Sequence, residues 1–113
     1  MDGQSAIVVL VTAPTADRAA ELARTLVEER LAACGNVVPG LRSIYRWEGK
    51  VQEDAEALLL LKTTRARFEA LRDRVLALHP YQVPEVIALP VEAGSAAYLD
   101  WIAAETSPPA TSS

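Results

Sequence analysis

The histidine His79 lies in the stretch HPYQVPEV, residues 79–86, and no other histidine occurs in the chain. An imidazole can act as a general base or bind copper, zinc or nickel, with Glu85 or Cys34 as a possible second ligand. No HxH, HxxxH or CxxC spacing accompanies it, however. The spacing alone therefore favours a third role, in which His79 ends a helix and Pro80 enforces the stop.

Covalent catalysis would need a nucleophile beside that histidine. Cys34 is the single thiol, and its setting in the sequence AACG does not place it near an imidazole. One cysteine also excludes a disulfide within the chain and fits a reducing compartment. Gly40 and Gly49 stand alone, so there is no glycine-rich phosphate loop. The sequence therefore predicts a protein that is not an enzyme.

Carboxylates and aromatic residues gather around the turn WEGK. Asp54 and Glu56 share one face of the strand after this turn, and edge charges of this kind prevent unwanted strand pairing. Tyr45 and Trp47 share one face of the strand before it. Further members of the set are Glu48, at the turn, and Tyr81, after the HP corner. Such sets line pockets or pack in interfaces, and interface packing is the commoner role.

The elements that would position these residues follow an alternating order. Apolar patterns and breakers predict one domain over residues 1–106, followed by a disordered tail over 107–113. The order is β-α-β-β-α-β plus a C-terminal helix, an α+β, ferredoxin-like sandwich with a long hairpin between its second and third strands. The expected elements are strands at 6–12 and 83–91, helices at 16–33, 65–79 and 96–105, and hairpin arms at about 41–47 and 51–62.

Charge and hydropathy restrict the partners. The formal net charge is −4, which argues against nucleic-acid binding. No basic leader or apolar run of spanning length is present, so we expect a soluble cytoplasmic protein with no membrane partner. Residues 7–11, 57–61 and 86–89 form continuous apolar runs, where a sheet wetted on one face would alternate. An apolar sheet face predicts an obligate homo-oligomer.

The chain resembles the CutA divalent-cation tolerance family over about residues 7–102. The motifs are LAACGNVVPGLRSIYRWEGKVQEDAEALLLLKT, HPYQVPEVIALPV and YLDWI. The resemblance implies a ferredoxin-like fold, a homotrimer built through the long hairpin, a cytoplasmic location, and tolerance of copper and other divalent cations. It implies no enzymatic reaction and no obligatory cofactor. Its trimer is similar to that of PII signalling proteins, which bind small effectors between subunits, and this is the alternative function.

The resemblance also assigns residues. Copper-binding members use a cysteine in the first strand and two histidines before the PY pair. The corresponding positions here are Val11 and Leu78, so that His79 alone matches. The predicted metal ligands are His79 and Glu85, with copper as the expected divalent cation.

A second group of residues is expected in a cleft between subunits. This prediction places the end of the third strand beside the HPY corner, so that Lys62 and the aromatic residues meet His79 and Glu85. Three functions follow from it: weak cation binding, binding of an anionic or zwitterionic effector, or hydrolysis with Glu85 as the acid. The predicted cleft residues are Tyr45, Trp47, Glu48, Lys62, Tyr81 and Cys34.

Overall fold

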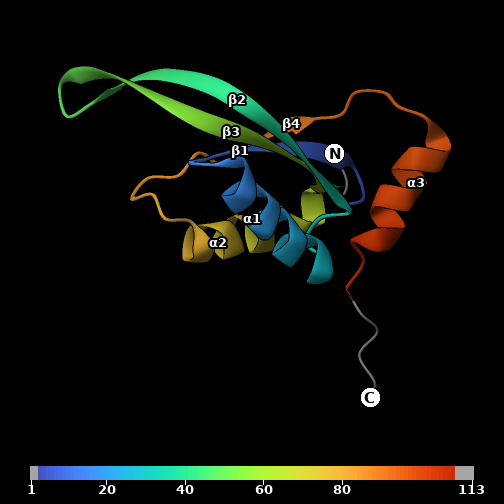
Figure 1. Ribbon diagram of the computed structural model, residues 1–113. Helices are drawn as coiled ribbons and strands as arrows, with labels where there is room; N and C mark the ends of the chain where they lie inside the picture. The colour runs from blue at the N-terminus through green and yellow to red at the C-terminus, as the bar shows by residue number, and fades with distance from the viewer. Residues whose placement is uncertain (1–2, 109–113) are drawn as a thin grey trace.

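The fold is described by a computed structural model over residues 3–108 (Figure 1). Its elements alternate in the predicted order, and a short 3₁₀ turn, Arg65–Arg67, precedes α2. The strands are β1 (Ala6–Ala13), β2 (Cys34–Trp47), β3 (Lys50–Thr64) and β4 (Ile87–Pro90). The helices are α1 (Ala16–Glu28), α2 (Phe68–Leu78) and α3 (Ala96–Glu105).

The four strands form one antiparallel sheet in the order β2-β3-β1-β4. Helices α1 and α2 lie side by side on one face, and α3 lies at the end of the sheet, away from the hairpin turn (Figure 1). The prediction of an α+β, ferredoxin-like fold with an extra C-terminal helix is confirmed. No helix in the described part of the chain is long and apolar enough to cross a membrane.

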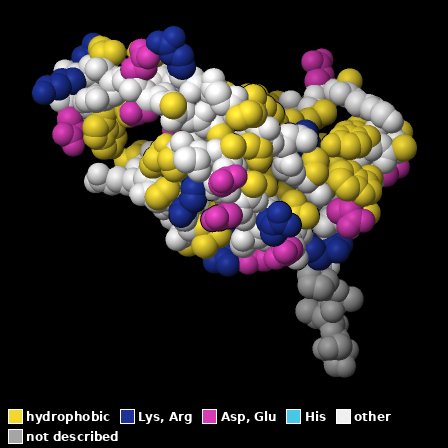
Figure 2. Space-filling model, viewed as in Figure 1, with side chains coloured by type: hydrophobic (Ala, Val, Ile, Leu, Met, Phe, Trp, Pro, Cys, Tyr) yellow, Lys and Arg dark blue, Asp and Glu magenta, His cyan; other side chains and the backbone are white. Residues whose placement is uncertain are grey.

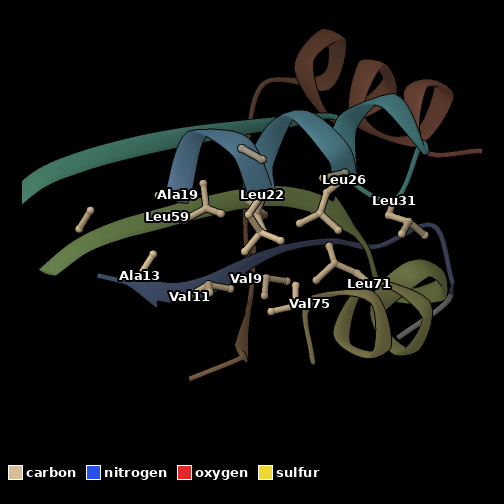
Figure 3. Close-up of a cluster of buried hydrophobic side chains, with 14 of the residues drawn as sticks. Val9, Val11, Ala13, Ala19, Leu22, Leu26, Leu31, Leu59, Leu71 and Val75 are labelled. Atoms are coloured by element: carbon tan, nitrogen blue, oxygen red, sulfur yellow. The ribbon is translucent and has the colours of Figure 1, made fainter. Parts of the chain in front are cut away.

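The core fills the space between the sheet and the two helices (Figure 3). Alternate residues of β1 and β3 point into it, and these odd-numbered positions pair across the two strands. Val9 pairs with Leu61, and Val11 pairs with Leu59; all four side chains are fully buried. The helices contribute Leu22, Leu26, Leu71 and Val75. Because the odd-numbered residues of β3 point into the core, its even-numbered residues point to the opposite face of the sheet.

Helix α1 begins as predicted and ends earlier. The Thr15 hydroxyl accepts a hydrogen bond from the Arg18 backbone N–H at 3.1 Å and so caps the N-terminus of the helix. The helix ends at Glu28, five residues before the predicted end at position 33, because Arg30 adopts a left-handed φ of 60°. Gly35 and Asn36, just beyond the predicted end of the helix, lie in β2.

The β2–β3 hairpin is longer than its predicted arms and projects beyond the rest of the sheet (Figure 1). Its register shifts between Val38 and Leu41, where Gly40 has a φ of 79°. Pro39 and Gly40 therefore form a bulge in β2. Strand β4, in contrast, covers 87–90 only, less than the predicted 83–91.

The face of the sheet away from α1 and α2 is apolar and partly open. Even-numbered residues of β1 and β3 point to it, and β4 adds Ile87 and Leu89, each about half exposed. Helix α3 packs at one end, where Ile102 is buried with Ala6 and Ala33, and leaves the remainder of the face uncovered. The apolar runs noted in the sequence are therefore buried on one face and unpartnered, within one chain, on the other.

The tail prediction falls largely outside the described residues, which end at 108. Ser107 itself is bonded to the folded part. Its carbonyl accepts a hydrogen bond from Arg30 Nε at 2.9 Å, and its hydroxyl donates to the Ala103 carbonyl at 2.9 Å.

Candidate functional site

The HPY corner is held by His79, which follows the last residue of α2. Its Nε2 donates to the Thr12 carbonyl at 2.7 Å, and its Nδ1 accepts from the Tyr81 backbone N–H at 3.1 Å. These two bonds define the neutral tautomer protonated on Nε2. Both ring nitrogens are thus engaged within the chain, and neither offers a lone pair to a metal ion in this conformation. The geometry matches the structural role that the spacing favoured.

Two tyrosine hydroxyls converge from this corner and from β2 onto the same face of β3. Tyr81 donates to Glu56 Oε2 at 2.6 Å, and Tyr45 donates to Asp54 Oδ2. Burial and the Glu56 carboxylate raise the pKa of Tyr81, and the bond to Asp54 raises the pKa of Tyr45. Both phenols therefore stay protonated at neutral pH.

A cleft of about 560 Å³ lies between these groups, beneath the projecting hairpin. Figure 2 shows the surface hollowed there, at the upper left of the view. The hairpin supplies one wall, and the loop after α2 supplies the other. The lining residues are Pro14, Tyr45, Trp47, Asp54, Ala55, Glu56, Pro80, Tyr81, Gln82 and Val83.

Glu85 lies beside the cleft without lining it. Partial burial, followed by the negative charge of Glu56, raises its pKa from the ordinary value of 4.5. Its carboxylate therefore lies close enough to interact with Glu56 electrostatically. The predicted metal ligand Glu85 thus lies near a second carboxylate, that of Glu56. The other predicted ligand, His79, uses both ring nitrogens in hydrogen bonds within the chain.

Lys62 and Cys34 lie elsewhere on the sheet. They pair with each other across β2 and β3, at the end of β3 farthest from the hairpin turn. Lys62 Nζ donates to Asn36 Oδ1, and Cys34 Sγ lies 3.5 Å from the Tyr98 hydroxyl. Within one chain, the end of the third strand does not neighbour the HPY corner, and their meeting between subunits stays a prediction. Within one chain, the corner contacts the middle of β3 instead, at Glu56.

Glu48 occupies the hairpin turn and does not line the cleft. Glu48 and Gly49 have φ values of 51° and 76°, the two positive angles of a type I′ turn. Of the six predicted cleft residues, the structure thus brings together Tyr45, Trp47 and Tyr81.

The cleft also contains two carboxylates that the sequence reasoning assigned to edge protection. Asp54 and Glu56 lie on the face that carries Tyr45, since Tyr45 pairs with Gln52. The alternation of β3 already placed them on one face, and the register of the hairpin shows which face. Across residues 3–108, no group of three or more His, Cys, Asp or Glu side chains is arranged to hold a metal ion.

The arrangement is suited to binding. Cys34 and His79 do not form a nucleophile–base pair in this structure. The Cys34 thiol contacts the Tyr98 hydroxyl, whereas the His79 ring contacts the Thr12 carbonyl. The cleft offers aromatic walls, two charged oxygen acceptors and a rigid proline-bounded corner. These groups can hold a small ligand, and they favour one that carries positive charge.

Known proteins match nearly the whole chain. The family model described as "CutA1 divalent ion tolerance protein" matches residues 7–105. The "Divalent-cation tolerance protein CutA" of Thermus thermophilus is 59% identical over 99 residues, covering 88% of this chain and 96% of that protein. "Protein CutA, chloroplastic" of Arabidopsis thaliana is 53% identical over 96 residues, covering 85% of this chain and 53% of the relative, about half its length.

Solved structures agree with the sequence matches. The "Divalent cation tolerance protein (Cut A1)" of Thermus thermophilus superposes with a TM-score of 0.88 at 57% identity, covering 90% of this chain and 99% of that one. CutA1 of Oryza sativa gives a TM-score of 0.88 at 50% identity, covering 91% and 94%.

Proposed function

This chain belongs to the CutA1 divalent ion tolerance family, and from that premise we propose that it acts as a homotrimeric, non-catalytic protein that binds small cations, copper(II) among them, in the cleft beneath its hairpin. The observation that carries the proposal is the meeting of Asp54 and Glu56 with three aromatic side chains in that cleft. Binding of cations in this cleft would give divalent-cation tolerance a direct chemical basis in this protein.

The open face of the sheet supports self-association. Half-exposed Ile87 and Leu89 extend an apolar surface that α3 covers at one end only. Burial of such a surface is the main driving force for association. A homotrimer is the state that the family resemblance implies. The projecting hairpin would then lie against a neighbouring subunit and would complete the cleft.

Copper would be held weakly, by carboxylate oxygens. Glu56 and Glu85 interact electrostatically, and Asp54 precedes Glu56 by two positions on the same face of β3. Oxygen ligands are a poor choice for copper compared with imidazole or thiolate, so affinity would be low unless subunits pool ligands. We leave His79 out of the proposed ligand set because both of its ring nitrogens make hydrogen bonds within the chain.

A calorimetric copper(II) titration of the full-length protein tests this assignment. His79→Gln removes the imidazole and keeps a side-chain N–H that reaches the Thr12 carbonyl. We expect this variant to bind copper(II) as wild type does, and Glu56→Gln to bind it several-fold more weakly. If affinity is lost in His79→Gln and kept in Glu56→Gln, the ligand assignment is wrong.

The second candidate is a PII-like effector protein. Three aromatic side chains line the cleft, and a metal ion would not contact them as ligands. They favour an organic ligand instead. Within one chain, Lys62 cannot bind an anionic effector in the cleft, because it lies at the other end of β3. Titration with organic ligands of each charge separates this candidate from metal binding.

A further inference from the structure

We propose that the cleft beneath the hairpin is a site for organic cations that carry ammonium groups, with linear aliphatic diamines preferred. This inference rests on the proposed function in one respect, namely that the cleft is where the protein binds its ligand. It goes further in naming the chemical class of that ligand, which neither the family nor its relatives' names specify.

The walls of the cleft suit a cation with an apolar body. Tyr45 and Trp47 project from β2 and are about 40% exposed, while Tyr81 faces them from the corner. Aromatic faces attract ammonium groups through the ring quadrupole and pack against methylene groups. The volume of about 560 Å³ lies within the usual range for small-molecule sites.

The floor supplies two acceptors at a defined spacing. Each carboxylate uses one oxygen, Asp54 Oδ2 or Glu56 Oε2, to accept from a tyrosine hydroxyl. The second oxygen of each is left for a ligand. The two residues lie two positions apart on one strand, about 6.6 Å along it. A four-carbon diamine is similar in length, so each ammonium group can meet one carboxylate.

Within the described part of one chain, no cationic side chain lines this floor. None of the described residues that line the cleft is Lys, Arg or His. The nearest ion pair on β3 joins Arg42 to Glu53, and strand alternation directs Glu53 to the other face. The cleft therefore repels anions.

An organic cation would use more of the cleft than a metal ion does. The two carboxylates that line the cleft supply only part of the coordination shell of a divalent cation, and Glu85 or water would have to supply the rest. The aromatic walls cannot coordinate a metal, whereas they contribute directly to the binding of an ammonium ligand.

The test is a calorimetric titration of the full-length protein, in its native oligomeric state, with four probes of equal carbon length. These are 1,4-diaminobutane, butylamine, 1,4-butanediol and succinate. We expect saturable binding of the diamine, weaker binding of butylamine, and no binding of the diol or of succinate. The double variant Asp54→Asn, Glu56→Gln should lose at least about tenfold in diamine affinity, because each charge-assisted hydrogen bond is strong.

Two variants control for loss of charge and for misfolding. Glu53→Gln removes one negative charge from the same strand but from the opposite face, and it should bind the diamine as wild type does. Trp47→Leu should weaken diamine binding several-fold while both carboxylates remain. Circular dichroism and oligomeric state confirm that each variant is folded.

The outcomes also separate this inference from the proposed function. Binding of succinate, equal binding of the diol, or no binding of the diamine to the native protein would overturn the inference. In each case, carboxylate-dependent copper binding and trimer formation can persist, and they are measured independently. A diamine that binds while copper(II) does not would support the inference and contradict the copper assignment.

Discussion

At the scale of single residues, His79 holds the HPY corner together through two hydrogen bonds. Its ring joins three segments: the end of α2, the Thr12 carbonyl of β1 and the Tyr81 backbone. The ring also packs against Tyr81, with centroids 4.6 Å apart. The orientation of Tyr81, and with it one wall of the cleft, therefore depends on a side chain that does not line the cleft itself.

A first prediction concerns the stability that these two hydrogen bonds contribute. His79→Ala leaves the Thr12 carbonyl and the Tyr81 N–H without this partner, and should lower the free energy of unfolding by about 1–2 kcal/mol. His79→Gln should recover part of the loss, since its amide N–H can reach the Thr12 carbonyl. Urea unfolding at one fixed protein concentration measures both variants. If both lose nothing, His79 does not stabilise the corner.

At the scale of the elements, the hairpin decides which residues can meet. Its strands of 14 and 15 residues exceed the length of β1 and β4, so its outer half projects beyond the core. The bulge at Gly40 and the turn at Gly49 fix the register between them. That register places Tyr45 on the face that carries Asp54 and, next to it, Glu56.

A prediction at this scale tests the hairpin turn. Gly49 has a φ of 76°, where a Cβ is unfavourable, so Gly49→Ala should destabilise the hairpin by about 1 kcal/mol. Glu48, with a φ of 51°, is the matched position, and Glu48→Asn should be neutral or stabilising because Asn tolerates this conformation. Hydrogen exchange of the hairpin amides measures both. Equal protection in Gly49→Ala and wild type would contradict the turn assignment.

The order of the strands and α-helices could be predicted from the sequence, because apolar runs and breakers mark them locally, whereas the sequence predicts an α-helix where the 3₁₀ turn Arg65–Arg67 lies. The end of α1 could not, since Arg30 adopts a left-handed conformation with no glycine to mark it. The separation of Lys62 from the cleft follows from strand register, which depends on pairing between distant segments. Asp54 and Glu56 were recognised as sharing a face, and only the fold shows that Tyr45 and Tyr81 share it as well.

At the scale of the whole molecule, the open sheet face needs a cover that one chain does not supply. One chain leaves the apolar residues Ile87 and Leu89 half exposed and projects a hairpin with Ile44 and Val51 about two-thirds exposed. These groups lie on separate surfaces, and association of several copies can bury both. In such an assembly, the cleft beneath the hairpin would lie near a subunit boundary.

The most direct measurement is the mass of the full-length protein in solution, obtained by sedimentation over a range of micromolar concentrations. We expect one species at three times the chain mass of 12.2 kDa. The variant Leu89→Asp, which places a charge on the open sheet face, should dissociate it. A matched change on the helical side, Glu21→Gln, should leave it intact. A monomer at every concentration would contradict the central claim that the protein works as a trimer with its sheet face covered by its own copies.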